Sequence, residues 1–149
     1  MSLDLTSRVR KEKLACFSPV ERDKVRGLLI DDDAADAANI RQLAAKSKQL
    51  DFRPKVCFTI DDARRILSEQ TFDVVYIDYW LGWETSVAFI SEFTKRHHAP
   101  CVMLTGLDEP DTRRVAFRAG VNAFLAKDEI STQAIEGVTL AVMTQRANR

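Results

Sequence analysis

The feature that most limits which fold this chain can adopt is a set of short apolar runs in which apolar and polar residues do not alternate. The clearest is the Val-Val-Tyr-Ile run at 74–77, which stops at Asp78. β-Branched and aromatic residues over so few positions indicate a strand buried on both faces. Such strands are typical of parallel sheets covered by helices. Asp78 would then stand at the carboxyl end of a strand, the edge of an open parallel sheet where ligands bind.

Strand and helix patterns alternate along the rest of the chain. Between the apolar runs, apolar residues recur at the spacing of one helix face. Asp33 is placed to cap the first helix, Pro110 suits the first turn of the fourth, and Gly120 suits its end. Strands are expected at 25–30, 55–58, 74–77, 101–104 and 123–126, and helices after 33, over 61–69, 85–96 and 110–119, and after 131.

This alternation predicts an α/β sandwich with a parallel sheet covered on both faces. Right-handed crossovers leave few topologies for five strands. The flavodoxin-like (βα)5 order 2-1-3-4-5 is favoured, because it places the most polar strand, preceded by Arg53 and Pro54, at an edge. The first and third strands would then be neighbours, which would bring Asp31 and Asp32 next to Asp78.

Polar side chains end four of the five predicted strands. Asp31 and Asp32 end the first, Asp78 the third, Thr105 the fourth and Lys127 the fifth. Three converging carboxylates repel one another, so the pattern implies a hard divalent cation, most naturally Mg²⁺. A carboxylate beside such an ion can attack phosphorus and form an acyl phosphate, with the amine as a mobile cation and the hydroxyl as a donor to phosphoryl oxygen. Each residue alone would be ordinary loop chemistry, but their joint placement favours a site.

The length and composition of the chain indicate its domain organisation and exclude some classes of function. We expect one domain at 25–147, residues 1–24 as an N-terminal extension, and no output domain in this chain. Lys plus Arg and Asp plus Glu both number 22, so the zero net charge predicts no binding to nucleic acid or to a membrane by bulk attraction. No run approaches the ~20 apolar residues of a membrane span. Cys16, Cys57 and Cys101 are odd in number and widely spaced, which suits buried thiols in a reducing cytoplasm.

As a set, these motifs resemble the response regulator receiver domain of bacterial two-component signalling, over about Val25 to Ala147. Four segments carry the resemblance, and each ends in one of the polar residues described above. They are Leu-Leu-Ile-Asp31-Asp32 for the family's acid pair, Val-Val-Tyr-Ile-Asp78 for its phosphoacceptor, Val-Met-Leu-Thr105 for its switch hydroxyl, and Phe124-Leu-Ala-Lys127 for its switch aromatic and lysine.

The resemblance implies a role for each of these residues. Asp78 would take a phosphoryl group from a histidine kinase or a phosphotransfer protein. Asp32 would bind Mg²⁺ directly, Asp31 would bind it through water, and the main-chain carbonyl of Trp80 would be a further ligand. The domain would act as a signalling phosphoacceptor that catalyses only its own phosphorylation and dephosphorylation.

The same resemblance implies a switch. Thr105 would move toward the phosphoryl group and Phe124 would turn inward, which would reshape the face formed by the fourth helix, fifth strand and fifth helix. That face would control a partner protein or an output domain. Phe124 taken alone is equally consistent with an ordinary core aromatic.

Three departures from the family pattern stand out. Gly82 replaces the proline that usually follows the phosphoacceptor, and Asp128 replaces the proline that is frequent after the lysine. Trp80 and Leu107 lie two residues beyond Asp78 and the switch threonine, at positions that border the path of the hydrolytic water in the family. Two large apolar side chains there should exclude water and prolong the life of the acyl phosphate.

Two alternatives remain open. A phosphatase of the haloacid-dehalogenase type also uses an aspartate nucleophile at a strand end, but it places a second aspartate where this chain has Trp80. The chain could also be a fragment of a longer regulator.

In the last helix, Gly137, Leu140 and Met143 could pack against a second copy to form a homodimer.

Overall fold

The computed structural model of the chain describes residues 21–106 and 110–147. Most of the expected extension at 1–24 lies outside the described residues, as do Cys16 and Leu107. Within these two ranges, no helix is long and apolar enough to cross a lipid bilayer.

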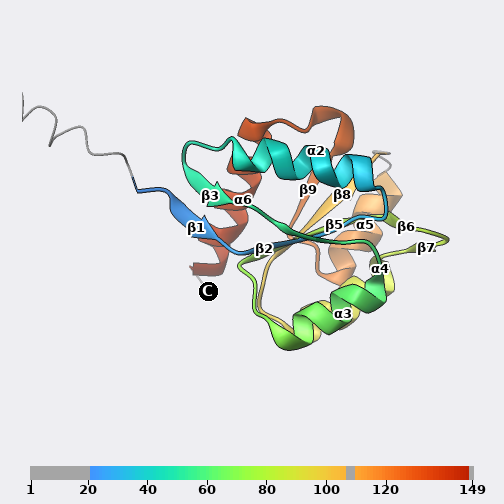
Figure 1. Ribbon diagram of the computed structural model, residues 1–149. Coiled ribbons are helices and arrows are strands. Elements are labelled where there is room, and N and C mark those ends of the chain that lie inside the picture. The colour runs from blue at the N-terminus through green and yellow to red at the C-terminus, as the bar shows by residue number, and fades with distance from the viewer. Residues whose placement is uncertain (1–20, 107–109, 148–149) are drawn as a thin grey trace, which may run out of the picture.

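A five-stranded parallel sheet forms the middle layer of the molecule (Figure 1). Its strands, counted along the chain, lie in the order 2-1-3-4-5, so the predicted flavodoxin-like topology is confirmed. The polar second strand lies at an edge, as its composition predicted. From edge to edge the strands are β4 (Lys55–Cys57), β2 (Gly27–Ile30), β5 (Val74–Asp78), β8 (Cys101–Thr105) and β9 (Ala123–Ala126).

Helices cover both faces of this sheet (Figure 1). Successive strand residues point to opposite faces, so Leu28 and Ile30 pack in one apolar cluster and Leu29 packs in the other. One helical layer is α2 (Ala34–Ala45) with α6 (Thr132–Ala147), and the other is α3 (Ile60–Glu69), α4 (Val87–Arg96) and α5 (Pro110–Ala119).

The starts of the helices follow from local side chains. Asp33 and Thr59 accept backbone N–H groups in the first turns of α2 and α3, so Asp33 is the cap that the sequence predicted. The predicted helix at 85–96 begins later, at Val87, because Thr85 pairs with Trp80 in a short antiparallel hairpin.

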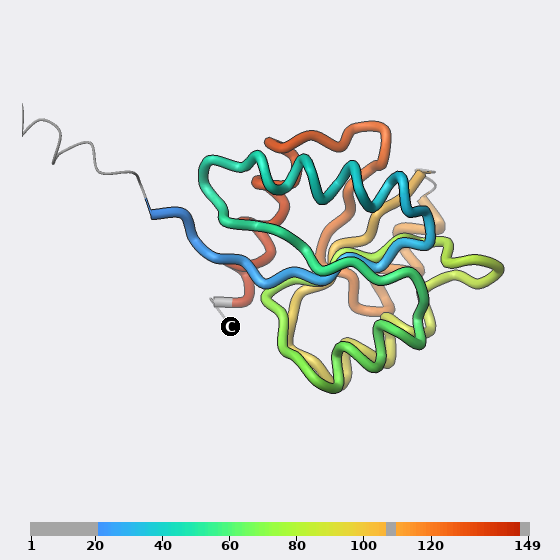
Figure 2. Tube along the Cα trace, in the orientation of Figure 1, coloured from blue at the N-terminus to red at the C-terminus, as the bar shows by residue number. Residues whose placement is uncertain are grey.

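The first predicted strand, 25–30, is wrong as a single element. It divides at Arg26, whose N–H group donates to the Asp73 carboxylate at 2.8 Å. The part before the break, β1 (Asp23–Val25), pairs with β3 (Leu50–Phe52), a strand that the sequence did not predict. Figure 2 shows these two segments running side by side before they continue into β2 and β4 of the main sheet.

Gly27 lets the start of β2 pack closely against Phe52 of β3. A Cβ atom on Gly27 would lie 2.7 Å from Phe52 Cζ and closer still to Cε2. Phe52 is fully buried and its ring lies 6.0 Å from that of Tyr76, so it has little room to yield. The glycine at the start of β2 therefore serves close packing between two strands.

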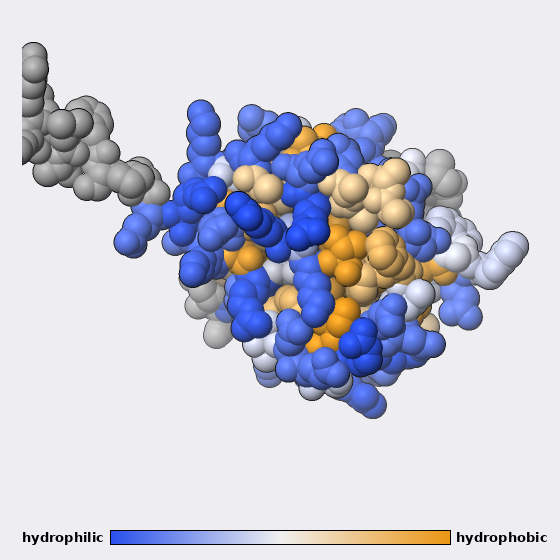
Figure 3. All heavy atoms as spheres, viewed as in Figure 1, coloured by the Kyte–Doolittle hydropathy of each residue, from blue (hydrophilic) through white to orange (hydrophobic). Residues whose placement is uncertain are grey.

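The edge strand β4 borders a groove of about 480 Å³ against α2. Figure 3 shows apolar side chains gathered on this face of the molecule, between α2 and α3. The groove floor is made of alanines of α2 with Val56 and Phe58, and Arg41 and Arg53 are among the residues that line it. The strand is only three residues long, which limits the backbone that this edge offers for pairing.

Cys57 and Cys101 are buried free thiols, as predicted. Burial raises the pKa of Cys57 to about 11 and the pKa of Cys101 to about 12. Both thiols are therefore protonated at neutral pH, unlike the thiolate of a reactive cysteine.

Candidate functional site

Three carboxylates meet at the carboxyl-terminal edge of the sheet. Asp31 follows β2, Asp78 ends β5, and oxygen atoms of Asp31, Asp32 and Asp78 all lie within 4.8 Å of one another. The parallel pairing of β2 with β5, with Ile30 opposite Ile77, places these strand ends side by side. Asp31 is fully buried and Asp78 is 9% exposed, whereas Asp32 is exposed.

Lys127 lies among these acids. It follows β9, and its Nζ atom lies 3.0 Å from Asp78 Oδ2 and 3.0 Å from Asp31 Oδ2. The lysine side chain is 20% exposed, so its ammonium group is held in a largely dry setting where ion pairs are strong. The structure thus brings together all four charged residues that the sequence proposed.

A fifth charged residue belongs to the site and was missed from the sequence. Asp36, in the first turn of α2, places its Oδ2 atom 2.8 Å from Lys127 Nζ, the shortest of the three contacts. Only the apolar face of this helix entered the prediction. The sequence could have indicated Asp36, because the first turn of a helix that directly follows a strand lies at the same edge of the sheet as the end of that strand.

Main-chain groups fix the carboxylates. Asp31 Oδ1 accepts the N–H of Asp33 at 2.9 Å, and Asp32 Oδ2 accepts the N–H of Gly82 at 2.9 Å. The N–H of Trp80 donates to Asp78. Gly82 belongs to a hairpin of β6 (Trp80–Leu81) and β7 (Glu84–Thr85) that projects from the body of the molecule (Figure 1).

Gly82 has two properties that proline lacks, a backbone N–H and a positive φ of 64°. We expect Gly82→Ala to lower the free energy of unfolding by about 1–2 kcal/mol, because alanine keeps the N–H but resists positive φ. Gly82→Pro should cost about 2–4 kcal/mol, since it also loses the bond to Asp32, although proline is what the family usually has here. Urea unfolding of the three proteins measures this, and a proline variant as stable as the alanine variant would contradict it.

The charges of the site shift two pKa values. Burial, only partly offset by Lys127 and reinforced by Asp31, raises the pKa of Asp78 from 3.8 to about 6. Burial alone would lower the pKa of Lys127, but its contacts with the carboxylates of Asp36, Asp31 and Asp78 outweigh that effect and raise it. Burial therefore makes the Asp78 carboxyl group easier to protonate, while three neighbouring carboxylates keep the ammonium group of Lys127 charged.

The donor set fits a divalent cation. Asp31 Oδ2 is buried and has no well-directed hydrogen-bond donor among the described residues, only the charge of the nearby ammonium group. This oxygen shares its neighbouring ammonium group with the carboxylates of Asp36 and Asp78, so a further cation would lower the cost of burying its charge. Asp31, Asp32 and Asp78 offer hard oxygen atoms close enough to share one ion, as Mg²⁺ prefers.

Two further predicted residues lie on the neighbouring strands. Thr105, the last residue of β8, is 3% exposed and pairs with Ala126, directly before Lys127. Phe124 of β9 is half-buried, and the guanidinium carbon of Arg113 lies 5.4 Å from its ring centroid. A cation over an aromatic face is an attractive contact, so Arg113 stabilises the ring orientation seen here.

Trp80 lies on the rim of the site. Its side chain is half-exposed, and its ring meets the ring of Tyr79 edge to face at 5.4 Å. Leu107, its predicted partner in excluding water, lies outside the described residues. Trp83 at the hairpin tip is 97% exposed.

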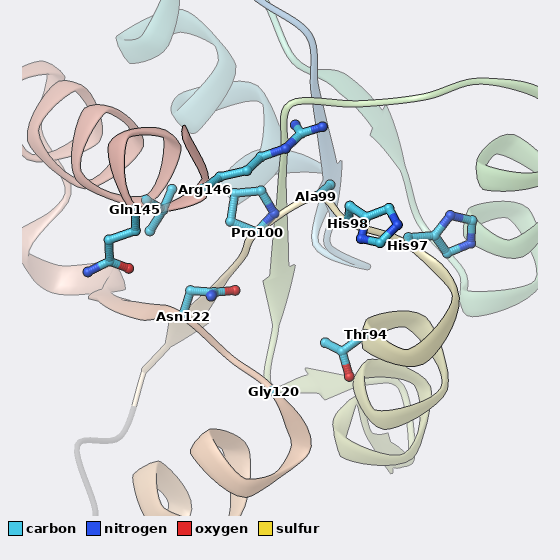
Figure 4. Close-up of a pocket in the computed structure, with 10 residues that line it drawn as sticks. Thr94, His97, His98, Ala99, Pro100, Gly120, Asn122, Gln145 and Arg146 are labelled. Atoms are coloured by element: carbon cyan, nitrogen blue, oxygen red, sulfur yellow. The ribbon is translucent and has the colours of Figure 1, made fainter. Parts of the chain in front are cut away.

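A separate pocket of about 370 Å³ lies at the opposite ends of the strands from the acid cluster, beside the residues that precede β8 and β9 (Figure 4). His97 and His98, which the sequence predicted to be solvated, are on its wall, where His98 is exposed and His97 is half-buried against the Phe93 ring. Asn122 in the same wall accepts the N–H of Cys101 at 2.8 Å and so has a structural role. No residue of the acid cluster lines this pocket.

The chain has relatives of known class. The response regulator receiver domain family matches residues 28–138. A protein of Rickettsia bellii (strain RML369-C) described as an NtrX-like response regulator is 32% identical over 103 residues, which are 67% of this chain and 21% of that protein. This chain therefore spans about a fifth of the length of the curated relative it matches.

Solved structures show the same fold. The receiver domain protein (CheY-like) from Methanospirillum hungatei JF-1 has a TM-score of 0.72 and 15% identity, covering 86% of this chain and 98% of that one. The beryllofluoride-activated NtrC4 receiver domain dimer has a TM-score of 0.72 and 20% identity, covering 81% and 98%. With the family's sequence pattern running from β2 into α6, this chain belongs to the response regulator receiver domain family of two-component signalling.

Proposed function

We propose that Asp78 accepts a phosphoryl group from the phosphohistidine of a histidine kinase or phosphotransfer protein, in a reaction that requires Mg²⁺. The observation that carries this proposal is the cluster of Asp31, Asp32 and Asp78 within 4.8 Å, with Lys127 Nζ 3.0 Å from Asp78 Oδ2. Nothing in the site favours a haloacid-dehalogenase phosphatase, because the residue two positions beyond Asp78 is Trp80.

The chemistry follows from these residues. A carboxylate oxygen of Asp78 attacks phosphorus, and the new P–O bond forms as the P–N bond to the donor imidazole breaks, with its electron pair staying on the imidazole nitrogen. Bound Mg²⁺ would neutralise charge on the transferring group. Asp32 and Asp78 would hold it directly, Asp31 would hold it through water, and the Trp80 carbonyl would be a further ligand. Lys127 supplies a protein cation whose Nζ atom lies 3.0 Å from the attacking carboxylate.

The conformational change that follows phosphorylation would pass through the neighbouring strands β8 and β9. Thr105, buried at the end of β8, would donate its hydroxyl to a phosphoryl oxygen. Phe124 would leave the Arg113 guanidinium group and turn inward, which would change the face of α5, β9 and α6. This face would control a partner or an output domain, so the domain works as a cytoplasmic signalling phosphoacceptor whose only catalysis is on itself.

A homodimer through the last helix receives limited support from the packing. Leu140 and Met143 are half-buried against the core beneath α6, and Gly137 is exposed. Two of the three residues proposed for that contact are thus already used in part by the domain itself.

Beryllofluoride binding tests the function. Beryllofluoride mimics a phosphoryl group on a carboxylate, and Trp80 beside Asp78 gives a native fluorescence signal. We expect saturable binding of beryllofluoride in Mg²⁺ buffer and none with EDTA. Incubation with acetyl phosphate should add one phosphoryl group that alkali or hydroxylamine removes, as expected of an acyl phosphate. No binding in Mg²⁺ buffer, or sustained turnover of p-nitrophenyl phosphate, would overturn the proposal.

Trp80 is also proposed to slow hydrolysis of the acyl phosphate, because a large apolar ring at the rim hinders the approach of water. We expect Trp80→Asn to release phosphate several-fold faster than the parent after loading with acetyl phosphate. Trp83→Asn in the same hairpin is the matched control, since that ring is almost wholly in solvent. A Trp80→Asn protein no faster than the parent would rule out this role.

A further inference from the structure

Asp36 differs from the other carboxylates that contact Lys127. Its Oδ2 atom lies 2.8 Å from Lys127 Nζ, closer than the oxygen atoms of Asp31 and Asp78. It is not among the acids whose oxygen atoms gather within 4.8 Å, which are Asp31, Asp32 and Asp78. Asp36 therefore contacts the cation of the site without belonging to the metal cluster.

The position of Asp36 is set by the fold. It lies in the first turn of α2, where the cap at Asp33 accepts its backbone N–H at 3.1 Å. Its side chain is 46% exposed, whereas that of Lys127 is 20% exposed. The helix thus holds a partly solvated negative charge against the ammonium group.

The charge balance gives this contact a consequence. The carboxylates of Asp31, Asp36 and Asp78 contact one ammonium group, and that of Asp32 lies within 4.8 Å of those of Asp31 and Asp78. This inference rests on the proposed function, in which Asp31 takes part in binding a metal ion and Asp78 accepts a phosphoryl group. Asp36 has neither, so it stays the counter-ion of Lys127 and cancels part of the positive charge that a phosphoryl group would meet.

We propose that Asp36 is a positioning residue that holds Lys127 toward α2 and thereby weakens the binding of a phosphoryl group while strengthening the binding of the metal ion. A fixed negative charge attracts a divalent cation and repels an anion at the same site. At separations of several ångströms and the effective dielectric of a partly exposed site, one charge changes each affinity by about 3- to 10-fold.

The test is Asp36→Asn, which keeps the size of the side chain and an oxygen acceptor for Lys127 but removes the charge. Tryptophan fluorescence titrations measure the affinity for Mg²⁺ alone and then for beryllofluoride at saturating Mg²⁺. We expect Mg²⁺ to bind about 3- to 10-fold more weakly and beryllofluoride about 3- to 10-fold more tightly than in the parent. Both changes should shrink as salt rises above about 0.1 M, where screening acts within ~10 Å.

Asp61→Asn is the matched control. Asp61 lies in the first turn of α3, pairs with Arg64 at 3.3 Å, and has a 94% exposed side chain, so both affinities should stay within about twofold of the parent. Asp36→Glu should restore the parental pattern.

The outcomes separate the two proposals. If the parent protein binds neither Mg²⁺ nor beryllofluoride, the proposed function fails and this inference fails with it. If the parent protein binds both Mg²⁺ and beryllofluoride, the affinities of Asp36→Asn decide whether this inference holds. Changes of opposite sign support the role of Asp36, whereas weakening of both ligands, which damage to the fold would produce, or any other pattern overturns it.

Discussion

Asp78→Asn is expected to abolish phosphorylation by acetyl phosphate and binding of beryllofluoride, and at the same time to make the Mg²⁺-free domain more stable at neutral pH. The first effect follows because the amide oxygen is too weak a nucleophile to attack phosphorus. The second follows because the variant removes one of three carboxylates that share the single ammonium group of Lys127. Asp111→Asn in α5, with an 89% exposed side chain, is the control for both.

The pH dependence of the second effect has a definite sign. The pKa of Asp78 is raised in the folded state from 3.8 to about 6, so the folded protein holds this proton more tightly than the unfolded chain does. The resulting penalty is absent below about pH 4 and complete above about pH 6, where it reaches at most about 3 kcal/mol. Thermal unfolding in EDTA should show Asp78→Asn more stable than the parent at pH 7.5, with a gap that closes toward pH 4. A variant less stable at both pH values would contradict this account.

Lys127→Ala is expected to destabilise the Mg²⁺-free domain by about 3–5 kcal/mol, the usual cost of breaking a buried ion pair by removing one partner. The reason is that Asp31, which is fully buried, and Asp78 would lose the ammonium group that lies 3.0 Å from each. For a domain of this size the loss corresponds to a fall in Tm of about 10 °C. Lys55→Ala, an exposed lysine on the edge strand, should change the free energy of unfolding by less than about 0.5 kcal/mol.

Mg²⁺ should rescue part of the Lys127→Ala defect. A divalent cation at the three acids replaces the missing positive charge, and at ten times its Kd it stabilises the folded state by about 1.4 kcal/mol. The gain in Tm on adding Mg²⁺ should therefore be larger for the variant, which has the greater excess of negative charge, than for the parent. Equal Tm values for variant and parent in EDTA would show that Lys127 is not the counter-ion of this cluster.

The fold could be predicted closely where the chain repeats a simple pattern. The apolar runs gave the positions of the buried strands, and the polar residues before Val56 identified the edge strand. Errors came where backbone atoms find unexpected partners. The break at Arg26 depends on the carboxylate of Asp73, and β3 exists because residues 50–52 meet the segment before that break.

The site divides in the same way. Asp31, Asp32, Asp78 and Lys127 follow strands, so the order of the strands was enough to bring them together. Asp36 sits on a helix, and its contact with Lys127 depends on the rotation of α2 over the sheet, which no strand-end rule provides.

The sequence by itself determined which residues end the strands of a parallel sheet, because burial on both faces demands continuous apolar runs and polar groups can begin only where the runs stop. Only the tertiary structure decided how the charges at that edge are shared: one ammonium group among three carboxylates, a carboxylate of α2 closest to it, and the N–H of Gly82 holding Asp32. Such sharing depends on distances of a few ångströms between segments far apart in the chain, and Coulomb energies in a poorly solvated site change steeply over those distances.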